Sequence, residues 1–121
     1  MKKIAVFALA IIGTVVLAWC TTKQTDANAN GVLDSFAQCV TDKWLKMYGT
    51  DWCPHCQNMK KMFGTAFSKI KFINCDEQKI QCDAAGVTGY PTWILNGNQY
   101  PGEKTLQELA NITQCEAPTV Q

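Results

Sequence analysis

The sequence has little charge of either sign: 17% of its residues are charged, and the formal net charge at pH 7 is +1. A chain so nearly neutral gives no indication of nucleic acid or of a strongly acidic or basic partner. It also lacks internal repeats, low-complexity tracts and a glycine-rich phosphate loop. Its 121 residues provide for one small domain.

Cysteine is abundant by contrast, with seven in the chain. In a reducing cytosol this number would indicate metal binding, whereas in an oxidising compartment it indicates disulfide bonds. The N-terminus favours the second reading, because Lys2 and Lys3 precede an uncharged run from Ile4 to Trp19. This is the shape of an export signal, slightly shorter than the roughly 20 residues that span a bilayer.

Three fates of this segment remain open. Residues 17–20 (Leu-Ala-Trp-Cys) resemble the lipobox of bacterial lipoproteins, which makes Cys20 a lipidation candidate. The departure is Trp19, which stands where a small residue is usual. The run can instead persist as an uncleaved anchor, and cleavage after Ala27-Asn28-Ala29 is a weaker third choice. All three predict an extracytoplasmic chain, and the first two predict one anchored to the membrane.

Hydrophobic periodicity divides the rest of the chain into alternating helices and strands. The expected helices are 31–41, a helix from 53, a short helix over 77–85 and a C-terminal helix around 106–112. The expected strands are 44–49, 69–74 and 92–95, and a hairpin turn is expected over 96–98. The apolar face of the helix from 53 consists of Met59, Met62, Phe63 and Phe67. Trp44 and Trp93 are expected in the core. The pattern predicts an α/β domain with helices on both faces of its sheet. The expected division is a signal or anchor over 1–20, a tether over 21–30 and one domain over 31–121.

The strongest chemical signal is Cys53-Pro54-His55-Cys56 at the start of an expected helix. Pro54 suits the first helical position, and the spacing predicts an exposed Cys53 sulfur with the Cys56 sulfur covered one turn further in. Backbone N–H groups and the helix dipole favour a thiolate there, and a protonated His55 can add to this effect. These effects stabilise the dithiol relative to the disulfide and predict an oxidising redox couple.

Other uses of two cysteines at this spacing fit the sequence less well. A zinc site requires a second close cysteine pair, which is missing, and haem attachment requires histidine where Gln57 stands. A structural disulfide across two residues is strained. A copper-binding module using Cys53, His55 and Cys56 remains open as a function of another class. We therefore expect a redox site with no cofactor and no metal.

Two motifs resemble the active site of thioredoxin-like proteins. Residues 47–56 are similar to the family's strand, loop and helix, and residues 89–92 (Gly-Tyr-Pro-Thr) are similar to its cis-proline loop. The resemblance implies a thioredoxin-like fold with a central mixed sheet and a first strand reduced or absent. It also implies a cis Tyr90–Pro91 bond that faces the sulfurs, with the Tyr90 backbone pairing to an extended substrate segment.

The same resemblance implies roles for the residues of the motif. Cys53 forms a mixed disulfide with a substrate cysteine, Cys56 resolves it and His55 tunes the thiolate. Pro54 supports the motif, and Trp52 shapes the substrate surface or packs beneath it. The chain is thus predicted to be an enzyme, a monomeric thiol–disulfide oxidoreductase.

The layout is closer still to the thioredoxin-like domain attached to, or partnering, bacterial homologues of vitamin K epoxide reductase. The matching segments are 36–39, 52–61, 89–94 and 100–102. The motif is also similar to that of periplasmic disulfide-forming oxidases. These resemblances imply an oxidase of cysteine-containing exported proteins that a quinone-linked membrane enzyme reoxidises. The alternative is a reductase or isomerase supplied by a transmembrane electron donor.

Two departures from thioredoxins proper bear on the direction of the reaction. The family buries an acidic residue paired with a lysine beneath the active site, and the matching positions here are Met47 and Phe72. The general base that helps a reductase is thus missing, which weakens the reductase alternative. Asp51 is expected to be exposed with a small tuning role, and Lys60 and Lys61 are expected on a solvated helix face.

Four cysteines remain besides Cys20 and the active pair, and they allow three connectivities. In a thioredoxin-like layout one end of the sheet brings Cys39 close to Cys115, and the other brings Cys75 close to Cys82. We therefore expect these two structural disulfides, each contributing about 2–4 kcal/mol. In the rival interpretation Cys75 and Cys82 relay electrons to a membrane partner.

Overall fold

The computed structural model describes residues 29–119. The elements are α1 (Ala29–Asp42), β1 (Lys46–Gly49), α2 (Pro54–Phe63), the 3₁₀ helix η1 (Gly64–Lys69), β2 (Lys71–Asn74), α3 (Lys79–Ala84), β3 (Thr92–Leu95), β4 (Asn98–Pro101) and α4 (Leu106–Thr113). The helix α1 begins at Ala29 rather than at residue 31. The expected signal, Cys20 and most of the tether lie outside the described residues. Within 29–119, no helix is long and apolar enough to span a membrane.

The four strands form one mixed sheet in the order β2-β1-β3-β4. β1 runs parallel to β2, where Met47 faces Phe72, and antiparallel to β3, where Met47 faces Trp93. β3 and β4 form a hairpin whose turn residues, Asn96 and Gly97, both have positive φ, as in a type I′ turn. No strand precedes β1 in the described part of the chain. The prediction of a mixed α/β sheet is confirmed.

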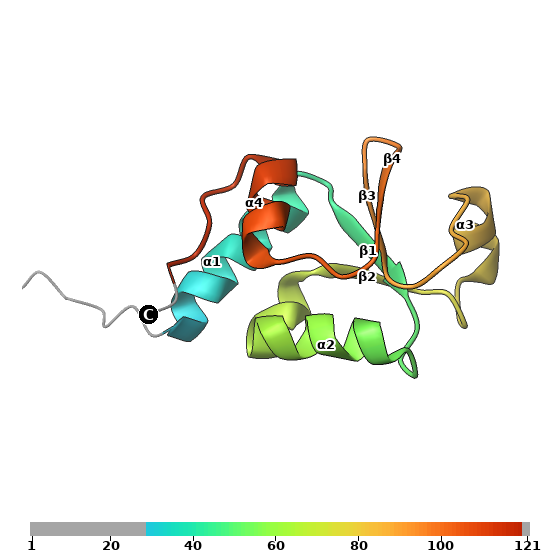
Figure 1. Ribbon diagram of the computed structural model, residues 1–121, viewed down its shortest axis with the longest axis horizontal. Coiled ribbons are helices and arrows are strands. Elements are labelled where there is room, and N and C mark those ends of the chain that lie inside the picture. Colours follow the sequence, from blue (N-terminus) through green and yellow to red (C-terminus); the bar gives the residue numbers. More distant parts are fainter. Residues whose placement is uncertain (1–28, 120–121) are drawn as a thin grey trace, which may run out of the picture.

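Side chains of the strands alternate between two hydrophobic clusters, and helices cover both. Met47 and Trp93 are fully buried in the larger cluster, together with residues of α1, α2 and α4. Tyr48 and Ile73 belong to the smaller cluster, which includes Cys82 of α3. Figure 1 shows α1 and α4 on one side of the strands and α3 on the other. The sheet thus has helices on both faces, as predicted.

Trp44 does not lie in the core, contrary to the prediction. Its side chain is 75% exposed, and its backbone φ of 69° lies in the left-handed region. Its N–H donates to the Thr41 carbonyl at 2.8 Å in the turn that ends α1, so β1 begins only at Lys46. Leu45 takes the buried position instead, whereas Trp93 is buried as predicted.

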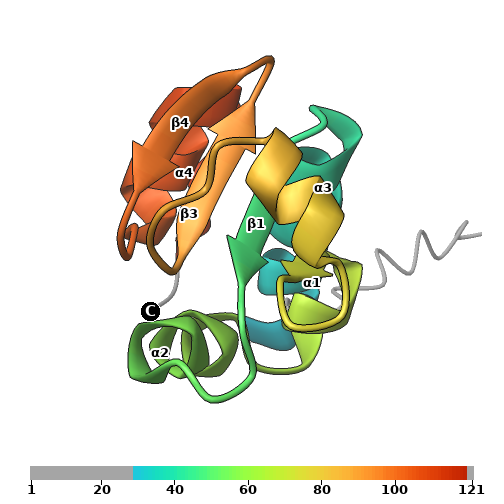
Figure 2. The same ribbon diagram turned by 90° about the vertical axis from the view of Figure 1, so that its right-hand side faces the viewer.

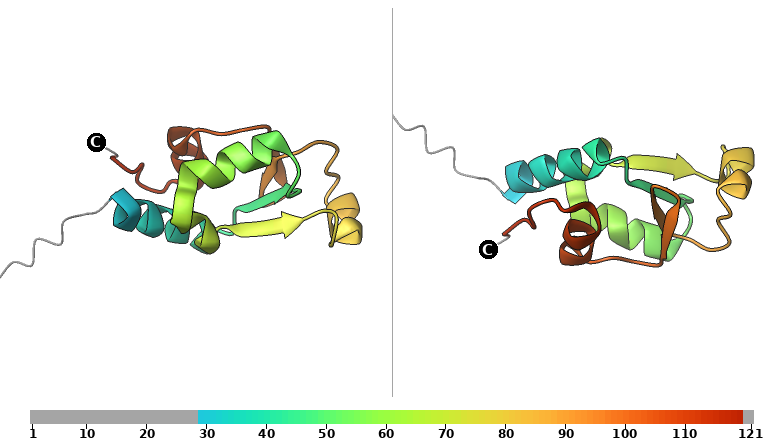
Figure 3. Two further views of the ribbon diagram at one scale, coloured as in Figure 1. Left: turned by 90° about the horizontal axis from the view of Figure 1, so that it is seen from below. Right: turned by 90° about the horizontal axis from the view of Figure 1, so that it is seen from above.

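Two disulfide bonds join elements at different ends of the domain. Cys39–Cys115 links α1 to the segment after α4 across 76 residues, and Cys75–Cys82 links the end of β2 to α3 across 7 residues. Figure 3 shows α1 and α3 at opposite ends of the molecule. These are the pairings that the thioredoxin-like layout implies. Cys75 and Cys82 are both buried, which favours a structural role over an electron relay.

Candidate active site

The Cys53-Pro54-His55-Cys56 motif lies where β1 ends and α2 begins. Pro54 is the first residue of α2, a position whose N–H has no partner within the helix, so proline loses no hydrogen bond there. Cys53 is the N-cap and has extended backbone. Figures 2 and 3 show the loop between β1 and α2 at the same end of the molecule as α3. The motif therefore lies at a helix N-terminus, where backbone N–H groups favour negative charge.

The two sulfurs of the motif are free thiols, and both are covered. Cys53 is 5% exposed, less than the sequence predicts, because the Tyr90 carbonyl lies 3.7 Å from its Sγ. Cys56 is fully buried. Its backbone N–H donates to Cys53 Sγ at 3.4 Å, a contact that stabilises negative charge on the first sulfur.

Gly49 is required by the close approach of the Cys56 sulfur. A Cβ at this position would lie 2.5 Å from Cys56 Sγ and 3.4 Å from Phe72 Cε2. The first distance is far inside van der Waals contact, and the sulfur belongs to a fully buried side chain. The glycine at the end of β1 thus allows Cys56 to pack directly on the strand.

Burial raises the pKa of Cys56 from 9.0 to about 12, and a hydrogen bond between its side chain and that of Cys53 adds to the rise. The Thr50 backbone and the Lys60 ammonium act in the opposite direction. Cys56 is therefore a neutral thiol over the physiological pH range, which suits a resolving cysteine that must stay unreactive until a mixed disulfide forms next to it.

Brief treatment of the reduced protein with iodoacetamide at pH 8 is expected to modify Cys53 and to spare Cys56. Only about one Cys56 in ten thousand is ionised four units below its pKa. Its labelling should rise about tenfold for each unit of pH until that pKa is reached. Peptide mass spectrometry measures both sites, and a Cys53→Ser variant serves as the control for Cys56 alone. Equal labelling of Cys53 and Cys56 at pH 8 would contradict the interpretation of Cys56 as the protonated, unreactive thiol.

An aromatic rim borders the Cys53 sulfur. The Tyr90–Pro91 bond is cis, and Pro91 is buried. The Trp52 indole N–H donates to Asp76 Oδ2 at 2.8 Å, and its ring meets Tyr90 edge-on with the centroids 6.2 Å apart. Trp52 is 64% exposed and Tyr90 36%. A substrate segment that paired with the Tyr90 backbone would thus lie beside Cys53.

His55 is exposed, and its hydrogen bond goes to a carboxylate. Its Nδ1 lies 2.6 Å from Glu103 Oε1, and Asn58 Nδ2 donates to the same oxygen at 3.0 Å. These hydrogen bonds from Asn58 and His55 lower the pKa of Glu103 from its ordinary value. The direct partner of His55 is therefore Glu103, and an effect of His55 on the sulfurs would act through its charge.

Lys60 departs from the prediction of a solvated helix face. Its side chain is only 28% exposed, whereas Lys61 is exposed as expected. Its Nζ pairs with Asp51 and lies 4.4 Å from the centroid of the Phe72 ring. Asp51 itself is exposed, as predicted. Met47 is fully buried, so this position contributes an apolar side chain rather than an acid.

No group of three or more His, Cys, Asp or Glu side chains within residues 29–119 is arranged to hold a metal ion.

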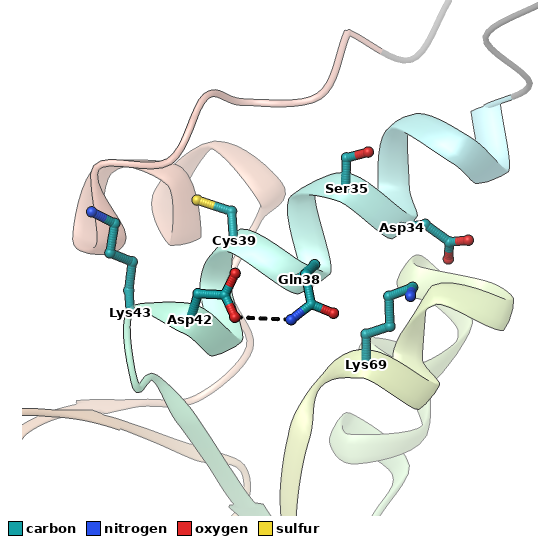
Figure 4. A pocket seen from close by; sticks show the side chains of 7 residues that line it. All are labelled: Asp34, Ser35, Gln38, Cys39, Asp42, Lys43 and Lys69. Atoms are coloured by element: carbon teal, nitrogen blue, oxygen red, sulfur yellow. Dashed lines mark hydrogen bonds between the residues drawn. The ribbon is translucent and has the colours of Figure 1, made fainter. Parts of the chain in front are cut away.

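A separate open groove runs along α1, where Gln38 donates to Asp42 at 2.9 Å (Figure 4). No residue of the redox motif lines the groove, and its one cysteine is disulfide-bonded. The lining residues are Asp34, Ser35, Gln38, Cys39, Asp42, Lys43 and Lys69.

The sequence does not predict the roles of several residues around the sulfurs. Lys60 lies four residues after Cys56, and this helical spacing was an available signal. Glu103 and Asp76 are brought to His55 and Trp52 from distant parts of the chain, so no local pattern identifies them.

Comparison with known proteins shows which family the chain is related to. The thioredoxin family profile matches residues 23–114. The thiol-disulfide oxidoreductase LTO1 of Arabidopsis thaliana is 38% identical over 77 residues, which are 56% of this chain and 20% of that protein. Protein disulfide isomerase-like 2-1 of Oryza sativa subsp. japonica is 35% identical over 82 residues, 56% of this chain and 22% of that protein.

The chain spans about a fifth of the length of these relatives. The family profile, in contrast, covers most of the chain, including both cysteines of the motif and the cis-proline loop. The domain is therefore of the thiol–disulfide oxidoreductase type, and the chain belongs to the thioredoxin family.

Proposed function

We propose that this chain oxidises cysteine-containing exported proteins outside the cytoplasm, with the Cys53–Cys56 disulfide as the oxidant. A substrate thiolate attacks Cys53 Sγ, the Cys53–Cys56 bond breaks, and Cys56 leaves as a thiolate that takes a proton from solvent. A second substrate thiolate then attacks the sulfur of the first, and Cys53 leaves. The substrate departs with a disulfide, and the chain retains the two electrons as a dithiol.

The environment of Cys53 supports the oxidising direction. Its Sγ accepts the N–H of Cys56 at the N-cap of α2, and the first turn of α2 contains no acidic residue to oppose a negative charge. Both features favour negative charge at this end of the helix, an arrangement that supports an oxidising couple. This placement of Cys53 is the observation that carries the proposal.

Continued oxidation requires an electron acceptor for the dithiol. We infer a quinone-linked membrane enzyme, a homologue of vitamin K epoxide reductase, because the order of motifs resembles the domain that such enzymes carry or partner. The uncharged run at 4–19 would hold the chain at the membrane if it stays as an uncleaved helix. If the run is cleaved off instead, a lipid on Cys20 would be the anchor. Either anchor would keep Cys53 near an integral membrane partner.

A second candidate is the same chemistry in reverse. Some relatives are named protein disulfide isomerase, which favours a reductase or isomerase supplied by a transmembrane electron donor. In that direction the Cys53 thiolate attacks a substrate disulfide and Cys56 resolves the mixed disulfide. The apolar Met47, at the position of the family's buried acid, provides no general base for this step.

The reduction potential of the Cys53–Cys56 pair distinguishes the two directions. The full chain in detergent is equilibrated in glutathione buffers, and free thiols are trapped and mapped by mass spectrometry. We expect a potential of about −120 mV, that of disulfide-forming oxidases, whereas a potential of about −180 mV would favour an isomerase. A potential near −270 mV, roughly that of thioredoxin, would favour the reductase. A Cys53→Ser variant lacks the pair and controls for the two other disulfides.

A further inference from the structure

Lys60 lies one helical turn after Cys56 in α2, in a position shielded from solvent. Its ammonium pairs with Asp51 and lies 4.4 Å from the centroid of the Phe72 ring and 5.7 Å from that of Phe67. Aromatic faces attract a cation, and the attraction strengthens when water is excluded. Three contacts therefore fix this charge near the site.

Asp51, whose carboxylate pairs with Lys60, is itself held at its side chain and at its main chain. Asn74 Nδ2 donates to Asp51 Oδ2 at 3.0 Å, and Gln57 Nε2 donates to the Asp51 main-chain carbonyl at 3.0 Å. Lys60 pairs with the other carboxylate oxygen. Because Asn74 ends β2 and Gln57 follows Cys56 in α2, the ion pair is tied to both elements beside the motif.

The Phe72 ring connects this ion pair to the buried sulfur. Cys56 Sγ and Phe72 Cε2 both pack against Gly49, on the side where a Cβ would stand. The ammonium lies over that same ring, and its charge lowers the pKa of Cys56. The charge of Cys53 raises the pKa of Cys56, whereas that of Lys60 lowers it and so favours ionisation.

The negative charge of Asp51 does not cancel this effect. Its side chain is 66% exposed, whereas that of Lys60 is 28% exposed, so water screens the carboxylate more strongly than the ammonium. A buried thiol with a pKa raised to about 12 must nevertheless ionise each time the disulfide forms or opens. The Lys60 ammonium thus lies near a thiolate, that of Cys56, whose formation burial makes unfavourable.

We propose that the Lys60 ammonium, held by Asp51 and Phe72, stabilises the Cys56 thiolate in the step that makes or breaks the Cys53–Cys56 disulfide. The inference rests on the proposed disulfide exchange. When the bond forms, Cys56 releases its proton to solvent, attacks Cys53 Sγ and displaces the partner sulfur as a thiolate. When it breaks, Cys56 leaves as a thiolate, which solvent protonates. Lys60 transfers no proton and stabilises the same anion in both directions.

The test follows the two steps separately in the full chain in detergent. The reduced protein is mixed with oxidised glutathione and quenched with acid, and intact mass spectrometry counts the Cys53–glutathione adduct and the Cys53–Cys56 disulfide. Lys60→Met removes the charge and keeps an apolar stem against the rings. Lys61→Met is the matched control on the exposed side of the same helix, and Lys60→Arg restores the charge.

Lys60→Met is expected to slow resolution of the adduct about tenfold, as a rise of one unit in the pKa of Cys56 would do, so the adduct accumulates. In Lys60→Met the rate at which the Cys53–glutathione adduct forms should not change. Lys61→Met should resolve the adduct as fast as the wild type, and Lys60→Arg should recover most of the resolution rate. Equal resolution rates in Lys60→Met and Lys61→Met would overturn the inference, as would equal slowing of both steps, which indicates general loosening. If the wild-type chain itself exchanges no disulfide, the proposed function fails instead.

Discussion

Replacing Cys56 by serine is expected to abolish turnover and to leave Cys53 covalently joined to the protein that reoxidises the chain. The reduced variant keeps the Cys53 sulfur at the N-cap of α2, so it can still attack a partner disulfide. It has no second thiol one turn inside the helix, and a serine hydroxyl does not displace a sulfur. The mixed disulfide therefore persists, and non-reducing electrophoresis with mass spectrometry identifies the bound protein.

The matched control is Cys53→Ser, which retains the buried Cys56. That thiol is fully covered and stays protonated because its pKa is raised to about 12, so this variant should capture nothing. Adducts of similar yield on both variants would mean that Cys56 also attacks partners. Continued turnover by Cys56→Ser would show that another thiol resolves the adduct and would contradict the assigned roles.

The fold could be predicted from the sequence where local rules act alone. Asn96-Gly97 forms a hairpin turn because both residues tolerate positive φ, and Pro54 begins a helix because it needs no N–H partner there. Trp44 shows the limit of this reasoning. Hydrophobicity placed it in a buried strand, yet the turn after α1 gives it a positive φ and leaves its ring in solvent.

The redox pair could also be predicted from residues close together in the sequence, but the residues that surround it could not. Cys53 and Cys56 lie within one helical turn, so their spacing alone predicts a redox pair. Glu103 reaches His55, and Asp76 reaches Trp52, only because the folded chain brings distant segments together. The position of Lys60 depends in the same way on two aromatic rings that the sequence does not place.

Removing the Cys39–Cys115 disulfide with a Cys39→Ala/Cys115→Ala variant is expected to lower the free energy of unfolding by about 4 kcal/mol. The bond closes a loop across 76 residues, so its loss greatly increases the entropy of the unfolded chain. Cys115 is also buried in the larger hydrophobic cluster, which adds a packing loss. Thermal unfolding should shift down by about 15–30 °C for a domain of this size.

The Cys75–Cys82 bond provides the matched comparison, because it closes only 7 residues and should contribute about 2 kcal/mol. Its loss should act locally as well. Asp76, next to Cys75, holds the Trp52 indole, so Cys75→Ala/Cys82→Ala should loosen the aromatic rim beside Cys53. Hydrogen exchange is expected to increase around α3 in this variant and throughout the domain in the other. A larger loss of stability from the shorter loop would contradict the chain-entropy argument and would indicate that α3 packing, rather than loop length, governs the stability of this domain.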